Sequence, residues 1–380
     1  ALVEILKSKN IESKIIAPKL APWTLKQWLD YDAIILLNLP AIDLDTRQQE
    51  MIEASVLQHG HGLIIAGGEN AYGPGGYFGT PLERMSPLSA KVPTDAPQVA
   101  MIFVLDRSGS MTQSVGDGTR LDIAKSATKS AIELLDRESE VSIIAFDSEA
   151  HVILPLQKKD LDKAVRSMAS LTPGGGTAIY PGLVEAEQQL AGNESKLKHI
   201  VVITDGLTQP GDFAGSVGRL RAIGASVSGV AIGSNADPAA VQEIARLGGG
   251  SFHATNDFQA LPGILARESM LLSTKPIRTY LTQPVWVDTS SPFLLNMPDN
   301  LPLLRGYVLT SLKPSANLHM QTTDETGATH PLLASWRYGN GRIIAAAMHG
   351  ISGWSELWQQ TPSFSLFWDQ SIRSLISETP

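Results

Sequence analysis

Runs of apolar residues alternate with amphipathic stretches through the middle of the chain. Continuous apolar runs of this length are typical of buried strands, and they predict strands at 99–105, 141–146, 199–204, 226–231 and 251–254. Helical periodicity predicts the intervening helices at about 119–136, 160–169, 178–190, 212–223, 238–246 and 257–271. A further strand at 150–154 follows a tight turn, so we expect it to run antiparallel at a sheet edge and to end at Pro155. The pattern predicts an α/β domain at residues 97–272.

The two flanks of this domain carry the same kinds of element but fewer of them. We expect strands at 14–17, ended by Pro18, and at 31–37, 62–68 and 342–348, with helices at 45–58 and 364–376. A Gly339-Asn340-Gly341 turn joins 335–338 to 342–348 as a hairpin. Neither flank has enough strands for a sheet of its own. The sequence therefore predicts one discontinuous α/β domain, 1–92 plus 275–380, with strands 33–37, 62–66 and 342–348 in a single sheet.

Candidate chemistry begins where the first central strand ends. Asp106-Arg107-Ser108-Gly109-Ser110 follows the apolar run 99–105, at the carboxyl end of a strand, where open α/β sheets place their ligands. Alternation along the loop would point Asp106, Ser108 and Ser110 the same way. Three oxygen donors without imidazole or thiolate suit Mg²⁺ or Mn²⁺. Asp and Ser are also common in ordinary turns. The motif alone therefore does not distinguish a metal site from a turn without a ligand.

Two further segments favour the metal site. Gly174-Gly175-Gly176-Thr177 is a flexible loop that ends in a hydroxyl, and a second apolar strand, 199–204, runs into Asp205. With these segments the chain resembles the von Willebrand factor A domain family with an intact metal-ion-dependent adhesion site, whose motif is filled by Asp106, Ser108, Ser110, Thr177 and Asp205. The resemblance implies a doubly wound, Rossmann-like fold. It also implies that the hydroxyls bind the ion directly, that the aspartates act through water, and that a carboxylate from a protein partner completes the site.

The flanks show a second resemblance, carried by Gly67-Gly68, Gly75-Gly76-Tyr77, the hairpin 336–342 and Phe367-Trp368. They look like the class I glutamine amidotransferase-like domains of bacterial membrane-anchored A-domain proteins. That chemistry needs a cysteine nucleophile, and the chain has no cysteine. His349 and Ser352 could form a dyad, but no third group is evident to orient it. We expect this domain to be catalytically inactive.

Composition narrows the class of partner. The 380 residues carry a net charge of −8, which argues against nucleic acid, since phosphate binding needs clustered basic residues. No apolar run is long enough to cross a bilayer, and the chain starts without Met. We therefore expect a soluble, extracytoplasmic fragment of a membrane-anchored bacterial protein, with its anchor outside the fragment. A hydrolase or transferase built on the flanking domain, and an intracellular assembly factor that partners an ATPase, remain as alternatives.

Three further sequence patterns suggest other binding sites. Gly174–Gly176 could cradle a phosphate, but no Lys-Ser or Lys-Thr follows, as a Walker motif requires. His59 and His61 form a weak candidate for a transition-metal site. Aromatic residues between Trp354 and Trp368 recur at helical spacing, which is more typical of a packed core than of a sugar-stacking surface.

Overall fold

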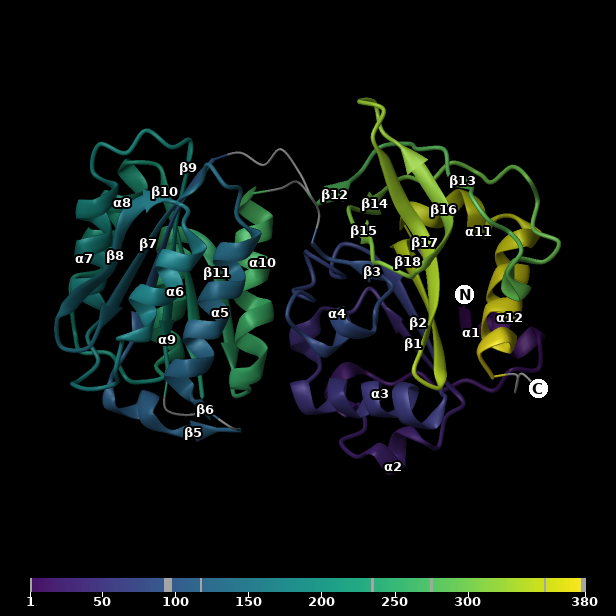
Figure 1. The fold of residues 1–380 in the computed structure, drawn as a ribbon, viewed down its shortest axis with the longest axis horizontal. Coiled ribbons are helices and arrows are strands. Elements are labelled where there is room, and N and C mark those ends of the chain that lie inside the picture. The colour runs from purple at the N-terminus through teal and green to yellow at the C-terminus, as the bar shows by residue number, and fades with distance from the viewer. Residues whose placement is uncertain are drawn as a thin grey trace. The chain divides into compact units, whose positions relative to one another are not determined.

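The computed structural model of the chain describes residues 2–91, 98–116, 118–233, 236–273, 276–351 and 353–376. These residues form two compact units, one from 1–93 with 275–380 and the other from 94–274. Each unit has a six-stranded sheet of its own, with helices packed against it (Figure 1).

The sheet of the 94–274 unit has the strand order β11-β10-β9-β4-β7-β8. Its neighbours pair in parallel except for β7 and β8, which are antiparallel, so the sheet is mixed and mostly parallel. The predicted central strands are all present. Their bounds are β4 (Val99–Asp106), β7 (Glu140–Phe146), β8 (Ala150–Lys158), β9 (Leu197–Thr204), β10 (Ala225–Ile232) and β11 (Gly249–Thr255), and a small hairpin adds β5 (Ser114–Val115) and β6 (Gly118–Thr119).

Helices cover both faces of this sheet, with α7 and α8 on one side and α5 and α10 on the other (Figure 1). On the first face, Val104 of β4 belongs to a buried cluster with Leu183, Val217 and Ile244. The helices stand close to the positions predicted from periodicity. They are α5 (Arg120–Leu134), α6 (Leu161–Ala169), α7 (Ile179–Leu190), α8 (Phe213–Ala222), α9 (Pro238–Gly248) and α10 (Leu261–Ser273), with short 3₁₀ turns η3 (Gly109–Thr112) and η4 (Phe258–Ala260).

Strand β8 is an antiparallel edge strand, as predicted, but it does not end at Pro155. It continues to Lys158. The register shifts between Val141 and Ile143 of β7, so that Pro155 falls in the irregular part of the ladder. A proline is tolerated at a bulge of an edge strand because its missing N–H interrupts no ladder hydrogen bond.

The sheet of the other unit draws on both flanking segments and has the order β1-β2-β18-β17-β16-β13. The parallel pairs β1–β2 and β2–β18 place 33–37, 62–66 and 342–346 in one sheet, as predicted, and the remaining pairs are antiparallel. The strands are β1 (Ala33–Leu37), β2 (Gly62–Gly67), β13 (Val285–Trp286), β16 (Asn317–Thr323), β17 (Thr329–Tyr338) and β18 (Gly341–His349). Two short ladders pair β3 (Leu88–Ser89) with β15 (Ser311–Leu312), and β12 (Ile277–Arg278) with β14 (Tyr307–Val308).

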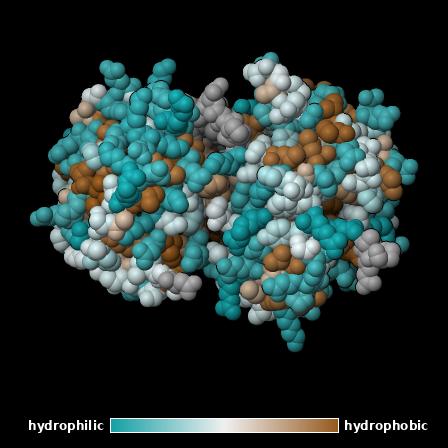
Figure 2. All heavy atoms as spheres, viewed as in Figure 1, coloured by the Kyte–Doolittle hydropathy of each residue, from teal (hydrophilic) through white to brown (hydrophobic). Residues whose placement is uncertain are grey.

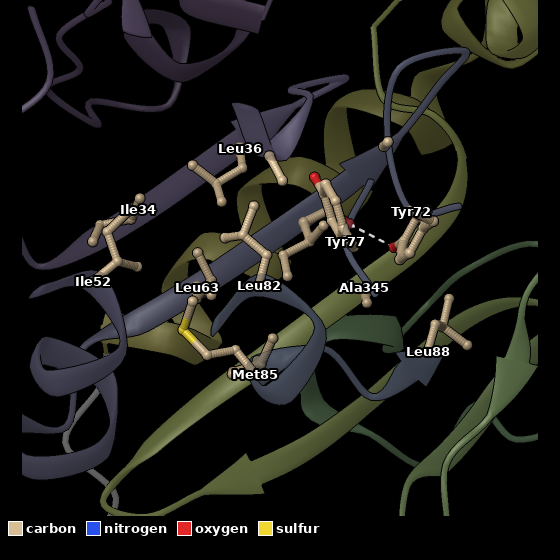
Figure 3. Close-up of a cluster of buried hydrophobic side chains, with 14 of the residues drawn as sticks. Ile34, Leu36, Ile52, Leu63, Tyr72, Tyr77, Leu82, Met85, Leu88 and Ala345 are labelled. Atoms are coloured by element: carbon tan, nitrogen blue, oxygen red, sulfur yellow. Dashed lines mark hydrogen bonds between the residues drawn. The ribbon is translucent and has the colours of Figure 1, made fainter. Parts of the chain in front are cut away.

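Two hydrophobic clusters stabilise this unit. One gathers Ile34, Leu63, Leu82 and Met85 with the buried rings of Tyr72 and Tyr77 (Figure 3). The other holds Trp358, Phe364, Phe367 and Trp368, so the aromatic residues near the C-terminus are core, as predicted. The helices are α1 (Leu2–Ser8), α2 (Leu25–Trp28), α3 (Thr46–His59), α4 (Pro81–Met85), α11 (Glu356–Gln359) and α12 (Pro362–Ile376), and 3₁₀ turns lie at Pro18–Leu20, Ala41–Asp43, Pro292–Leu294 and Gly353–Ser355.

The prediction of a strand at 14–17 is wrong. These residues are extended in part, with Ala17 at φ −67° and ψ 143°, but they pair with no strand of the described chain. The side chain of Ile15 is 80 % exposed. A residue before proline prefers an extended backbone whether or not a partner strand is present, so local preference alone produced the apparent strand.

In the part of the chain that the structure describes, no helix is both long and apolar enough to cross a membrane. In the view of Figure 2, hydrophobic residues form small separate areas within a largely hydrophilic surface.

Candidate metal-binding site

The site begins with two neighbouring parallel strands that end at the same edge of the sheet. Strands β4 and β9 are paired up to Leu105 and Ile203, so Asp106 is level with Thr204 and Asp205 follows one residue further along. Both carboxylates are almost completely buried. Two buried carboxylates at one sheet edge are costly unless donors or cations satisfy them.

Asp106 is held by hydrogen bonds to both of its oxygens. The backbone N–H of Ser108 donates to Oδ1 at 2.7 Å, and the hydroxyl of Thr204 donates to Oδ2 at 2.6 Å. Burial raises the pKa of Asp106, and repulsion from Asp205 adds to the rise, while the bonds from Ser108 and Thr204 oppose it. The carboxylate is therefore fixed in orientation, and a cation beside it would relieve the cost of its burial.

The two serine hydroxyls connect the carboxylates. Ser108 Oγ lies 3.0 Å from Ser110 Oγ, and Ser110 Oγ donates to Asp205 Oδ1 at 2.5 Å. A hydroxyl that donates its one proton keeps lone pairs that can bind a cation. Four of the five predicted residues are thus connected by hydrogen bonds, with the backbone N–H of Ser108 making the link to Asp106.

The glycine loop brings the fifth residue to the same place. Gly175 has φ +79°, and a Cβ built there would lie 2.7 Å from Cβ of Asp147, so the loop fits closely against this residue only as glycine. The backbone N–H of Gly174 donates to the carbonyl of Arg107 at 2.7 Å. Thr177 Oγ1 lies against Gly206, at 3.0 Å from a Cβ built there. The structure thus places Thr177 beside the residue that follows Asp205.

Charged residues without a predicted role also line the site. Arg120 Nη1 donates to Asp205 Oδ2 at 2.6 Å. Asp147 follows β7, the other neighbour of β4, and its Oδ2 lies 3.4 Å from Arg107 Nε and 3.3 Å from His151 Nε2. The position of Asp147 directly after an apolar strand is a signal that could have identified it. Nothing in the sequence marks Arg120.

The donor set fits a hard divalent cation. The network consists of carboxylate and hydroxyl oxygens, the ligands that Mg²⁺ and Mn²⁺ prefer. The guanidinium of Arg120 already forms an ion pair with Asp205. The carboxylates at this edge of the sheet therefore bind a positively charged group.

Comparisons with known proteins show the family to which this part of the chain is related. Residues 101–207, which run from β4 to just beyond Asp205, match the family described as von Willebrand factor type A domain. A Bacillus subtilis relative, the uncharacterized protein YwmD, is 30 % identical over 177 residues, which are 42 % of this chain and 78 % of that protein. The chain belongs to the von Willebrand factor type A domain proteins.

The chain is also similar to a second curated protein and to a solved structure. The uncharacterized protein sll0103 of Synechocystis is 37 % identical over 114 residues, or 30 % of this chain; the chain spans only 26 % of the length of that relative. The structure of an aerotolerance-related membrane protein from Bacteroides fragilis is 22 % identical, with a TM-score of 0.41, and covers 45 % of this chain and 98 % of that one.

The competing sites in the other unit gain no support. His59 and His61 have no further ligands gathered around them, because the described residues contain no group of three or more His, Asp or Glu side chains arranged to hold a metal. Burial lowers the pKa of His61, and charge repulsion from the neighbouring His59 lowers it further. Burial also lowers the pKa of His349, which closes β18. Ser352, the other half of the candidate dyad, lies outside the described residues.

Proposed function

We propose that the type A domain is a divalent-metal-dependent protein-binding module, with Mg²⁺ or Mn²⁺ as its ion. The network joining Asp106, Ser108, Ser110 and Asp205 carries this proposal. Ser108, Ser110 and Thr177 would hold the ion through their hydroxyl oxygens, and Asp106 and Asp205 through water. A bound divalent ion supplies an electrophilic centre that binds an anionic oxygen ligand.

The hydrogen bonds of the two aspartates favour binding over hydrolysis. Both oxygens of Asp106 accept hydrogen bonds from the protein, and both oxygens of Asp205 do likewise. Neither carboxylate is therefore poised to take a proton from water, as a general base must be. The uncompensated charge of the ion would instead attract a carboxylate from a partner protein, so we expect the partner to present an exposed Asp or Glu.

The other unit serves, in this proposal, as an inactive amidotransferase-like scaffold, because the chain has no cysteine nucleophile. Purified protein should show no glutaminase or esterase turnover above background. Turnover that disappears in His349→Ala would favour the hydrolase alternative. As the family resemblance implies, we place the protein in the bacterial cell envelope, which fractionation of the source cells would test.

A capture experiment tests the binding role directly. The protein is immobilised and exposed to an envelope extract with Mn²⁺ or with a chelator, alongside Asp106→Ala. We expect the wild-type protein to capture a defined partner in Mn²⁺ but not in chelator, and Asp106→Ala to capture it in neither. A matched control is Asp212→Ala, which alters an exposed helix cap on α8 and should keep both metal and partner. Equal capture by Asp106→Ala in chelator would contradict a metal-mediated role.

A further inference from the structure

Arg120 is fixed beside the candidate site by its own backbone. It is the first residue of α5, directly after the β5–β6 hairpin, and its N–H donates to the carbonyl of Gln113 at 2.9 Å. Thr119 caps the helix by accepting from the N–H of Asp122 at 3.2 Å. A cation at the first turn opposes the helix dipole. A neighbouring anion would offset this unfavourable interaction.

The compensating anion is Asp205. Arg120 Nη1 lies 2.6 Å from Asp205 Oδ2, with 14 % of the arginine side chain and 1 % of the aspartate side chain exposed. The guanidinium carbon also lies 4.6 Å from the ring centroid of Phe258, within the range of a cation–π contact. Helix, carboxylate and ring together hold the positive group at one oxygen of Asp205.

The local charges show what this contact does. Asp106 and Asp205 carry two negative charges, and Arg120 cancels one of them. The pair of Arg107 and Asp147 on the other side of the site adds no net charge. A divalent ion at the hydroxyls would therefore meet a net charge of about −1 instead of −2. Because both carboxylates are almost completely buried, this difference is only partly screened.

We propose that Arg120 is a built-in counter-cation of the metal site, which weakens binding of the bare ion and makes its stable retention depend on a carboxylate from the partner. This inference rests on the proposed function. Arg120 lowers the negative charge available to the ion, so the ion keeps more positive charge for an incoming anion. Arg120 thus acts through its charge beside Asp205, and this charge couples metal binding to ligand binding.

Calorimetric titration of the whole chain with Mn²⁺, with and without excess acetate as a simple carboxylate, tests this coupling. We expect Arg120→Gln to tighten binding of Mn²⁺ in the absence of acetate on the order of tenfold, as removal of a nearby positive charge predicts. The increase in Mn²⁺ affinity that acetate causes should be smaller in this variant than in the wild type. Arg120→Lys should stay near the wild type because it keeps the charge. Arg219→Gln removes an equal charge from an exposed pair with Glu187 and should change neither quantity.

The opposite outcomes are equally defined. If Arg120 only holds Asp205 in place for the ion, Arg120→Gln will weaken Mn²⁺ binding, and the proposal is wrong. Unchanged affinity in this variant, with loss of binding in Asp106→Ala, would overturn the counter-cation role and leave the metal site standing. Absence of Mn²⁺ binding in all variants would overturn both. Should Arg120→Gln fail to fold, Phe258→Leu, which removes the ring that packs on the guanidinium together with some buried apolar contact, should shift affinity in the same direction.

Discussion

The hydroxyl of Thr204 donates to Asp106 Oδ2 at 2.6 Å across the adjacent strands β9 and β4. This bond fixes the carboxylate that begins the candidate site. The other carboxylate oxygen of Asp106, Oδ1, accepts a hydrogen bond from the backbone N–H of Ser108 in the loop that follows β4. Orientation of Asp106 therefore depends on a residue almost a hundred positions away in the sequence.

Replacing Thr204 by Val should loosen the site without changing the shape of the core. The variant loses the hydrogen bond to the charged Asp106, worth about 1.5–3 kcal/mol, and also the acceptor for the N–H of Gly206. We therefore expect Mn²⁺ affinity measured by calorimetry to fall by roughly tenfold or more. Thr128→Val is the matched control, because Thr128 is also buried but donates only to the helix carbonyl of Ala124. If both variants lose stability and neither loses metal affinity, Thr204 has no role in the site.

Thr177 offers a test of the loop. Thr177→Ala removes one hydroxyl beside Gly206 while the backbone bond from the N–H of Gln209 to its carbonyl can remain. We expect unchanged folding by circular dichroism and a loss of partner affinity of roughly tenfold, or about 1.4 kcal/mol. Thr112→Ala removes an exposed hydroxyl that donates to the carbonyl of Gly109 and should behave like the wild type. Equal loss in the two variants would point to a general disturbance of the rim.

Much of this fold was predictable because its strands are buried on both faces. An apolar run such as 99–105 needs no information about its partners to be recognised. The segment 14–17 shows the limit of that reasoning: its short apolar run meets Pro18 and finds no neighbouring strand. Pairing is a property of the whole sheet, which a local pattern does not contain.

The same distinction applies to the site. Asp106, Ser108 and Ser110 are close in sequence, and Asp205 ends a recognisable strand, so their meeting follows from the edge shared by parallel strands. Arg120 reaches Asp205 from the start of a helix. Its role depends on the direction of one long side chain, which no spacing in the sequence encodes.

The rim of the site carries an exposed apolar side chain that predicts the character of the partner. Leu207, two residues after Asp205, is 72 % exposed. A leucine buried at an interface contributes about 1.5–3 kcal/mol, so Leu207→Ser should weaken capture of the partner about tenfold or more while leaving Mn²⁺ affinity unchanged. Leu281→Ser, in the other unit and also exposed, is the control. A partner that binds Leu207→Ser with full affinity would contact the metal without covering this side of the rim.

Stability at low pH should depend on a buried cluster at the start of β9. Glu268 of α10 accepts from Ser228 Oγ at 2.6 Å and from His253 Nε2 at 2.9 Å, and His199 Nε2 lies 3.3 Å away. Burial would raise the pKa of Glu268, but the hydrogen bonds from the two imidazoles and their charge outweigh it. The pKa therefore lies well below its ordinary value of 4.5.

A carboxylate with a depressed pKa in the folded state stabilises the protein above its unfolded pKa, and the contribution falls as the pH drops from there toward the folded pKa. Glu268→Gln should thus lower the melting temperature at pH 7 by about 10 °C, the scale of about 3 kcal/mol lost from a buried pair. The difference from the wild type should shrink as the pH falls below 4.5. Glu243→Gln breaks an exposed pair with Arg246 and should shift melting little, since surface pairs are weak. A Glu268→Gln deficit that stays constant from pH 7 to pH 3 would show that shape and packing, rather than charge, make this glutamate stabilising.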